Sequence, residues 1–331
     1  MHSRLKIHIL LLTGLMLSGP AHSLELSDYP KVQQFIIDME QQHNFDSYVL
    51  EQLFEEVEIR QDIIDIMNTP GEAKPWYQYK DQFVTQLNAK RGVRFWKKWR
   101  RELEHAQHQY GVDIEIILGI IGVETQFGIN RGRHRVIDAL TTLAFVFPRR
   151  NALFRRELEQ FLILSRELKQ NPLTVTGSYA GAIGLPQFLP SSYREYAVDF
   201  DRDNWINLMG SETDSIGSIA NYLKVHGWQR GEPIIDIAYV DDSNLGWLDP
   251  DDIKPSMSMI DLKARGVSAA IHTNDDDRKA ALLRLQGAQE NIYRLGFDNF
   301  YVITRYNKST KYAIAVIELG NLIKDRYYNE K

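Results

Sequence analysis

Residues 111–128 read GVDIEIILGIIGVETQFG, and this stretch decides the fold. Its apolar residues recur at the i, i+3, i+4, i+7 spacing of one helix face, at Ile114, Ile117, Leu118 and Ile121. The spacing predicts an amphipathic helix that begins after Asp113 and buries one apolar stripe. Glu124 lies one turn beyond Ile121, at the flank of that stripe.

The carboxyl group of Glu124 is the first candidate for a catalytic group. Burial of a lone carboxylate raises its pKa, because desolvation disfavours the charged form. A carboxyl that stays neutral near pH 7 can act as a general acid, and glycoside cleavage needs such a group to protonate the leaving oxygen. Gly119, Gly122 and Gly128 permit close approach of a backbone or a ligand. The alternative is a structural glutamate that reaches solvent or a buried hydrogen-bond partner.

The composition is that of a globular protein. The chain has 331 residues, enough for two or three packed units, of which 44% are hydrophobic and 25% charged. A formal net charge of -5 argues against nucleic acid as the main partner, because phosphate binding requires a basic face. The 6 Trp, 16 Tyr and 14 Phe supply faces that suit sugar rings, although most such residues fill cores.

The N-terminus has the three parts of a secretory signal peptide. Arg4 and Lys6 carry positive charge, residues 7–17 are apolar, and Ala21-His22-Ser23 is a small-x-small cleavage site. The apolar run is too short to span a bilayer, so we expect cleavage after Ser23 and export to the periplasm. The chain has no cysteine, which excludes a lipidated cysteine and disulfide bonds. We therefore expect a soluble protein without a lipid anchor or a membrane span.

Much of the remaining chain has helical periodicity. Helices are expected over 29–67, 93–110, 136–144, 152–168 and 215–226. Residues 68–71 (NTPG) are a clear break, and Gly111 is expected to end the helix before it.

The pattern changes after Gly227. Residues 230–287 contain many Pro, Gly and Asp residues and only short apolar runs. This texture predicts a small β-rich insertion with a strand over 233–240. Residues 280–285 fit a strand or a helix equally well by periodicity.

The C-terminal segment is expected to return to a helical core. Residues 300–305 look extended, since they include a β-branched run. A last helix is expected from Tyr312 to Asp325, with Ser309 or Thr310 as its cap.

The segment GIIGVETQFG resembles the catalytic-helix motif of the lytic transglycosylases of the membrane-bound lytic murein transglycosylase B family. Four further blocks resemble the same family and occur in the family's order: DALTTLAF with PRR (138–150), GSYAGAIGLPQFLPSSY (177–193), IGSIANYLKVHGW (216–228) and NFYVITRYNKSTKYA (299–313). The resemblance runs from about Val32 to near the C-terminus, so it covers almost the whole mature chain.

This resemblance implies a mainly α fold with a catalytic core like that of goose-type lysozyme. The expected organisation is a signal peptide over 1–23 and an N-terminal helical unit over 24–100. The lysozyme-like core would comprise 101–229 and 288–331, and the small β-rich domain 230–287.

The resemblance also implies a reaction. Such enzymes are lyases that cleave the β-1,4 bond between N-acetylmuramic acid and N-acetylglucosamine in peptidoglycan without water. The muramic O6 hydroxyl closes onto C1 and gives a 1,6-anhydro end. By similarity, Glu124 protonates the glycosidic oxygen and then takes the proton from O6, while the 2-acetamido group stabilises the cationic intermediate. One carboxylate then suffices where two are usual, and catalysis needs no cofactor.

Two other functions stay open at this point. A muramidase that uses water needs a second carboxylate opposite Glu124. Asp138 and Glu115 are nearby in sequence, but helical geometry gives neither an obvious claim to that role. A non-catalytic scaffold that binds glycan would use Glu124 only structurally. Peptidoglycan strands are the expected partner in each case, and the sequence indicates no protein partner.

The Gly-rich segment from Gly177 to Tyr193 is a candidate wall of the saccharide groove. Its glycines let the backbone approach a ligand, while Ser178, Gln187 and Phe188 offer hydrogen bonds and a stacking face. The resemblance places Ser178 and Gln187 along the groove. Relatives tend to have YGQF where this chain has Leu185-Pro186-Gln187-Phe188, which puts the strength of one sugar contact in doubt. An ordinary Gly-rich connector is the alternative.

Tyr306, Asn307 and Tyr312 resemble the second wall of the family's groove. Asn307 would hold an acetamido group, and the two tyrosines would stack on sugar or orient Glu124. A Tyr-Asn pair before a helix is otherwise a common turn.

A candidate calcium loop consists of Asp199, Asp201, Asp203, Trp205 and Asp214. Oxygen ligands at positions 1, 3, 5 and 7 are the EF-hand arrangement, with a backbone carbonyl at position 7. The resemblance implies calcium binding here, in a structural role. Position 6 is Asn204 where Gly is usual, although Asn tolerates the left-handed conformation. The spacing to Asp214 is one residue longer than in relatives, and a solvated acidic loop is the alternative.

Overall fold

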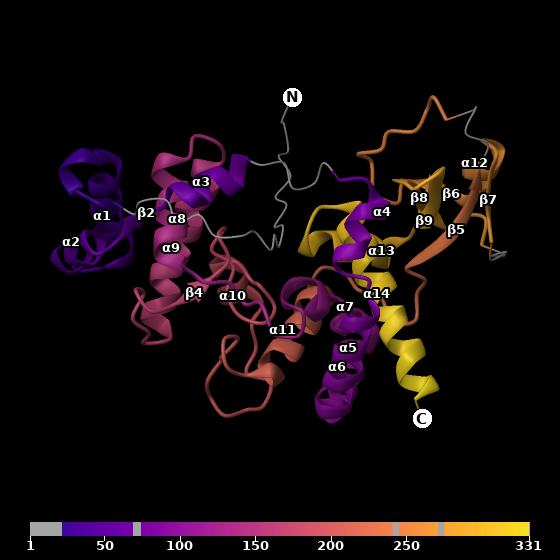
Figure 1. The fold of residues 1–331 in the computed structure, drawn as a ribbon, viewed down its shortest axis with the longest axis horizontal. Coiled ribbons are helices and arrows are strands. Elements are labelled where there is room, and N and C mark those ends of the chain that lie inside the picture. The colour runs from indigo at the N-terminus through magenta and orange to yellow at the C-terminus, as the bar shows by residue number, and fades with distance from the viewer. Residues whose placement is uncertain (1–21, 69–73, 241–244, 271–274, 331) are drawn as a thin grey trace. The chain divides into compact units, whose positions relative to one another are not determined.

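A computed structural model describes residues 22–68, 74–240, 245–270 and 275–330 (Figure 1). Packing divides the chain into two units. The first unit includes 74–127 and 219–330, and the second includes 22–68 and 128–218. The division falls within one helix, α11 (Glu212–Val225).

The second unit is built from helices and two small antiparallel ladders. Its N-terminal elements are β1 (His22–Ser23), a 3-10 turn (Leu26–Asp28), α1 (Pro30–His43), α2 (Ser47–Glu55), β2 (Glu58–Ile59) and α3 (Gln61–Asn68). Its later elements are β3 (His134–Arg135), α8 (Val136–Thr141), a π-helical turn (Thr142–Val146), α9 (Asn151–Glu167), β4 (Thr176–Gly177) and α10 (Pro190–Tyr196). Strand β1 pairs with β2, and β3 pairs with β4. Asn44 adopts a left-handed conformation that ends α1, and Asp46 caps α2.

The first unit contains the longest helix of the described chain. Its helices are α4 (Trp76–Tyr79), a 3-10 turn (Lys80–Gln82), α5 (Gln86–Lys98), α6 (Arg100–Tyr110), α7 (Ile114–Thr125), α13 (Asp298–Tyr306) and α14 (Thr310–Asn329). The single helix expected over 93–110 is two helices that meet at Trp99. The predicted stop at Gly111 is confirmed, since this residue has φ 77°.

Helix α7 packs against α14 with almost no space between their backbones. A Cβ atom on Gly119 would lie 2.2 Å from the carbonyl oxygen of Val316, and one on Gly320 would lie 2.3 Å from that of Glu115. Two glycines, one on each helix, therefore set the distance between the two axes. Eleven of the twelve residues of α7 are buried, so the helix lies inside the unit.

The first unit also carries a five-stranded antiparallel sheet of order β6-β8-β9-β5-β7. The strands are β5 (Ile235–Val240), β6 (Met257–Ser258), β7 (Val267–Ala269), β8 (Lys279–Gln286) and β9 (Asn291–Gly296), and α12 (Met259–Ala264) packs beside them. Residues 280–285 are thus a strand, in register with β9 from Ala281–Gly296 to Gln286–Asn291. The sheet encloses its own apolar cluster, which includes Leu262, Leu282 and Leu295.

One local prediction is wrong. Residues 300–305 are not extended but belong to α13, and Thr304 donates its hydroxyl to the carbonyl of Tyr301. The β-branched run suggested a strand, but burial of Phe300 and Ile303 on one helix face outweighs that propensity. The predicted cap at Ser309 is confirmed, because its hydroxyl accepts the amide of Tyr312.

The mainly α fold is confirmed by these elements, and the domain boundaries expected from the sequence stay a prediction. The expected cleavage site follows β1, while residues 1–21 of the predicted signal peptide and 69–71 of the predicted break lie outside the described residues. Among the described residues, every helix is too short or too polar to cross a membrane.

The contact between α7 and α14 gives a test of stability. We expect Gly119→Ala to lower the free energy of unfolding by about 2 to 3 kcal/mol, because its methyl group would collide with a rigid carbonyl. Urea denaturation measures this change. The control is Gly246→Ala, where no atom lies within 4 Å of the added carbon; the two variants losing equal stability would contradict the interpretation.

Candidate active site

Glu124 lies in the last turn of α7 and is only 5% exposed. The helix ends directly after it, because Gln126 has φ 51° and its amide donates to the carbonyl of Gly122 at 3.1 Å. On the same helix, Gly122 faces Leu319 of α14. The sequence therefore places a carboxyl at the end of a buried helix. The helix itself was predicted, but α7 is not amphipathic with a single buried stripe, because eleven of its twelve residues are buried.

The side chain of Tyr312 fixes this carboxyl. Its hydroxyl donates to Oε1 of Glu124 at 2.6 Å, from the first turn of α14. Burial raises the pKa of Glu124 from 4.5 to about 8, and the hydrogen bond from Tyr312 opposes part of that rise. Burial also raises the pKa of Tyr312 well above 10, so the phenol stays a donor. Because Oε1 accepts from the phenol, Oε2 is the oxygen left to carry the proton of Glu124.

A stack of aromatic rings continues from this pair. The ring of Tyr306 lies nearly parallel to that of Tyr312, with 6.4 Å between centroids. Tyr222 meets Tyr306 edge-on at 4.9 Å and stacks on His226 at 4.0 Å. The hydroxyl of Tyr222 donates to the carbonyl of Arg305 at 2.7 Å, which ties α11 to α13. Sequence reasoning predicted Tyr306 and Tyr312 but missed Tyr222 and His226.

His226 has its own fixed orientation. Its Nδ1 lies 2.7 Å from the carbonyl oxygen of Tyr222, one turn earlier in α11. A carbonyl only accepts, so Nδ1 carries a proton in this contact. The i, i+4 spacing of Tyr222 and His226 in NYLKVHGW was the available signal, and a helical Tyr-His pair is too common to have identified them.

Asn307 follows α13 and is 7% exposed. Its carbonyl accepts the amide of Ser309, the cap of α14, at 2.7 Å. The link between α13 and α14 is thus a short turn that positions both Asn307 and Tyr312. The structure brings Glu124, Tyr306 and Tyr312 of the predicted set together within the first unit.

The remaining predicted sugar contacts lie in the second unit. The hydroxyl of Ser178 accepts the amides of Ala180 and Ala182 at 3.2 and 3.0 Å, which closes the Gly-rich loop on itself. Gln187 has φ 51°, and its Nε2 donates to the carbonyl of Gly184 at 2.8 Å. Phe188 is buried at 2% exposure. These bonds make the segment an ordered turn with inward side chains.

The side-chain oxygen of Gln187, unlike its side-chain nitrogen, has no hydrogen bond among the described residues. This oxygen, Oε1, is buried. A buried acceptor without a donor costs free energy. Leu185, where relatives have an aromatic, is fully buried and so packs inside the turn.

The acidic loop gathers three carboxylates. Oxygens of Asp199, Asp201 and Asp203 all lie within 4.8 Å of one another. Hard cations such as calcium prefer this oxygen donor set, so these residues fit such an ion. Asn204, at the position where Gly is usual, adopts the left-handed conformation, with φ 69°.

Asp214 is placed differently from these three residues. Its two oxygens accept the amides of Phe200 and Asn207, each at 2.8 Å, and it is fully buried. Burial raises its pKa above the ordinary value of 3.8. Asp214 therefore holds the two ends of the loop through hydrogen bonds to their backbone amides. Trp205, within the loop, is 39% exposed.

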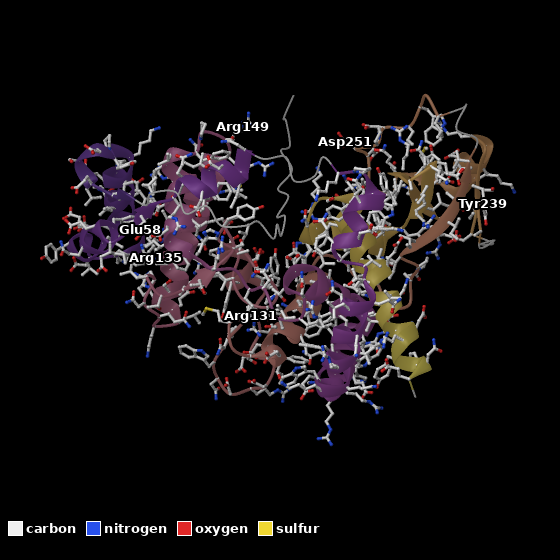
Figure 2. All side chains as sticks on the ribbon, in the orientation of Figure 1. Glu58, Arg131, Arg135, Arg149, Tyr239 and Asp251 are labelled. Carbon is white, nitrogen blue, oxygen red and sulfur yellow. The ribbon has the colours of Figure 1, made fainter. Side chains whose placement is uncertain are left out.

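Glu58 and Arg135, which are labelled in Figure 2, belong to a separate cluster with Asp138. Arg135 Nε donates to Asp138 at 2.6 Å, and the Glu58 amide donates to the other Asp138 oxygen at 3.1 Å. Burial raises the pKa of Asp138 above 3.8. Glu115, the other carboxylate near Glu124 in sequence, accepts from Lys324 at 2.6 Å.

Comparison with known proteins identifies the family of the chain. The profile of the Transglycosylase SLT domain family matches residues 27–321. Membrane-bound lytic murein transglycosylase B of Escherichia coli (strain K12) is 39% identical over 326 residues, which cover 94% of this chain and 89% of that protein.

Two solved structures have the same fold. The soluble lytic transglycosylase SltB1 from Pseudomonas aeruginosa has a TM-score of 0.84 and 45% identity, and the match covers 90% of this chain and 99% of that one. The Escherichia coli lytic transglycosylase Slt35 in complex with calcium has a TM-score of 0.85 and 39% identity over 93% and 97% of the two chains. These matches confirm the expected lysozyme-like fold class. The chain belongs to the family of lytic transglycosylases with the SLT domain.

Proposed function

We propose that this lytic transglycosylase uses Glu124 as its single acid and base and releases 1,6-anhydro-muramic ends from peptidoglycan. The observation that carries the proposal is the buried carboxyl of Glu124 with a pKa of about 8. At neutral pH such a group is protonated and ready to donate, which an ordinary glutamate is not.

The proton moves twice in the proposed reaction. Glu124 first gives its proton to the oxygen of the β-1,4 bond, and the bond from that oxygen to C1 of muramic acid breaks. The 2-acetamido group stabilises the cationic carbon. The Glu124 carboxylate then takes the proton from the muramic O6 hydroxyl while O6 bonds to C1. The carboxyl is restored and no water is consumed.

The positions of Asp138 and Glu115 support the lyase over a hydrolase. A hydrolase that uses water needs a second carboxylate as its base or nucleophile. Asp138 is engaged by Arg135 and a backbone amide, and Glu115 by Lys324. Neither Asp138 nor Glu115 is therefore free to activate water.

Tyr312 has a positioning role in this proposal. Its phenol holds Oε1 and leaves Oε2 to transfer the proton. Tyr306 and Asn307, at the end of α13 and directly after it, would contact the sugar. Ser178 and Gln187 complete the proposed saccharide set by their likeness to the family motif. Oε1 of Gln187, which has no donor among the described residues, suits a sugar hydroxyl or acetamido N–H. Phe188 would support this set from inside the turn, because at 2% exposure its ring has no open face for a sugar.

Calcium would bind to the loop of Asp199, Asp201 and Asp203, with the carbonyl of Trp205 as a further ligand. The three gathered carboxylates support this proposal, as does the calcium complex of Slt35. Asp214 would support the loop through its hydrogen bonds to the amides of Phe200 and Asn207. The ion would hold this loop in shape and takes no part in the cleavage.

The proposed location is the periplasm, where peptidoglycan lies. It is supported by the charged, apolar and small-x-small parts of residues 1–23.

The product of digestion tests the role of Glu124. With purified peptidoglycan as substrate, the full chain should yield muropeptides that lack one water and no new reducing ends, as read by mass spectrometry. Glu124→Gln should lower the rate at least about 1000-fold, because it removes the only proposed acid and base.

The matched control is Glu115→Gln, which removes a carboxylate from the same helix without touching the site. It should keep most of the activity. New reducing ends from the wild-type chain would identify a hydrolase, and full activity of Glu124→Gln would refute the assignment.

The pH dependence tests the protonation state of Glu124. Cleavage should fall as pH rises through about 8, because the acid form is lost there. The hydrogen bond from Tyr312 lowers the pKa of Glu124. Tyr312→Phe should therefore slow the reaction and shift the fall in rate to higher pH. Rates over a pH series measure both effects.

Stability supplies an independent readout of the same pKa. The pKa of Glu124 is about 8 in the folded chain and 4.5 ordinarily, so the neutral carboxyl stabilises the fold fully below pH 4.5. This contribution to the free energy of unfolding is lost as pH rises through about 8. Glu124→Gln should lack this loss and be more stable than wild type above pH 8. If the free energy of unfolding changed with pH in the same way for the wild type and Glu124→Gln, a raised pKa of Glu124 would be contradicted.

Calcium should stabilise the folded chain. At calcium concentrations ten- to a hundred-fold above Kd, the free energy of unfolding should rise by about 1.4 to 2.7 kcal/mol, because the ion binds only the folded loop. Thermal unfolding with calcium or with chelator measures this. Asp203→Asn should abolish the gain and Asp325→Asn, an exposed change on α14, should keep it; the same gain in both variants would place the ion elsewhere.

A further inference from the structure

The charged residues of α5 and of the start of α6 are all cations (Figure 1). Residues 86–101 contain seven Lys or Arg residues and no Asp or Glu. The whole chain has a formal net charge of -5, so the other residues together are more acidic than the chain as a whole. The seven cations are Lys90, Arg91, Arg94, Lys97, Lys98, Arg100 and Arg101.

Packing of α5 against α14 fixes which of its side chains face outward. A Cβ atom on Gly92 would lie 2.5 Å from Cδ1 of Ile323. The ring of Trp96 stacks on that of Tyr327, with 4.2 Å between centroids. These contacts hold the apolar side of α5 on α14. The opposite side carries cations that are all exposed, because helical residues three and four apart share a face: Lys90, Arg94, Lys97 and Lys98.

Few of these cations are neutralised by carboxylates of the protein. Lys97 pairs with Glu330 at 3.1 Å, and Arg100 pairs with Glu104 at 2.7 Å. A concentration of charge of one sign attracts a partner of the opposite sign. The cations that form no ion pair within the described part of the chain are Lys90, Arg94, Lys98 and Arg101.

Apolar side chains accompany the cations. Leu87, in the first turn of α5, is 56% exposed and shares the helix face of Arg94, seven residues later. Nζ of Lys98 lies 4.7 Å from the centre of the Trp99 ring, so this half-buried indole lies beside the cations. A helix face with this composition suits the surface of a bilayer, because its apolar groups enter the headgroup region while its cations contact lipid phosphates.

We propose that the outer face of α5 binds the protein peripherally to a membrane surface that contains anionic phospholipid. A bilayer presents many phosphates side by side, so several cations of one helix contact anions at once and their contributions add. An acidic peptide is the other class of partner. The outer face of a helix is convex, however, which suits a broad surface better than a single chain that binds in a groove.

Sedimentation with vesicles tests the proposal. The exported chain is used, without the predicted signal peptide, so that the apolar residues 7–17 do not contribute to binding. Vesicles of phosphatidylcholine are compared with vesicles of phosphatidylcholine and phosphatidylglycerol in equal parts. The anionic vesicles should bind the protein at least about 30-fold tighter at low salt. Added salt should reduce this preference, since exposed charges are screened.

Substitutions then locate the binding face. The triple variant Lys90→Gln, Arg94→Gln and Lys98→Gln should bind anionic vesicles about 100-fold more weakly, because each cation near anionic lipid contributes a factor of about five.

A matched control removes three exposed cations of the same unit outside this face, through Lys224→Gln, Lys263→Gln and Lys279→Gln. It has the same net charge as the first triple variant and should keep most of the affinity. Glutamine is a good helix former, so both triple variants should fold, and urea denaturation checks that they do.

Three results would overturn the proposal. The first is equal affinity for the two kinds of vesicle, and the second is an equal loss of affinity in the two triple variants. The third is binding of a poly-glutamate peptide through Lys90, Arg94 and Lys98 without binding of vesicles, which would identify an acidic peptide as the partner. None of these measurements involves Glu124 or peptidoglycan, so the outcome is separate from that of the proposed reaction.

Discussion

The close contact of α7 with α14 is the constraint on which the site depends. Gly119 and Gly320 let the two helices approach until each would-be Cβ meets a carbonyl of the other helix. At this distance the first turn of α14 brings Tyr312 within 2.6 Å of Glu124. The same approach removes Glu124 from water, so the packing that stabilises the unit also sets the protonation state of the acid.

Two opposing influences act on that acid. Burial favours the neutral carboxyl, and the phenol of Tyr312 favours the charged one. A single-carboxylate mechanism needs both forms in turn, because the group gives a proton and then takes one back. An acid held only by burial would donate well but would be poorly stabilised as a base, whereas the phenol lowers the cost of the charged form.

The sequence predicted the helix of Glu124 because its apolar spacing is regular and Asp113 and Gly111 mark its start. It also predicted the cap at Ser309. It failed at 300–305, where β-branched residues favour a strand but tertiary burial selects a helix. It missed Tyr222, since the contacts of this residue with Arg305 and Tyr306 join segments that no local pattern connects. The glycan-binding set and calcium were suggested by likeness to a family, and remain predictions.

The direction of α7 has a consequence for Glu124 that its burial does not convey. A helix carries partial negative charge at its C-terminal end, where the last carbonyls have no amide partner within the helix. Glu124 stands in that last turn, one residue before Thr125 ends the helix. The polarity of the backbone therefore repels a carboxylate there and adds to the affinity for a proton. A carboxyl in the first turn would meet the opposite field, so reversing the chain through this position would make a weaker base from the same side chain.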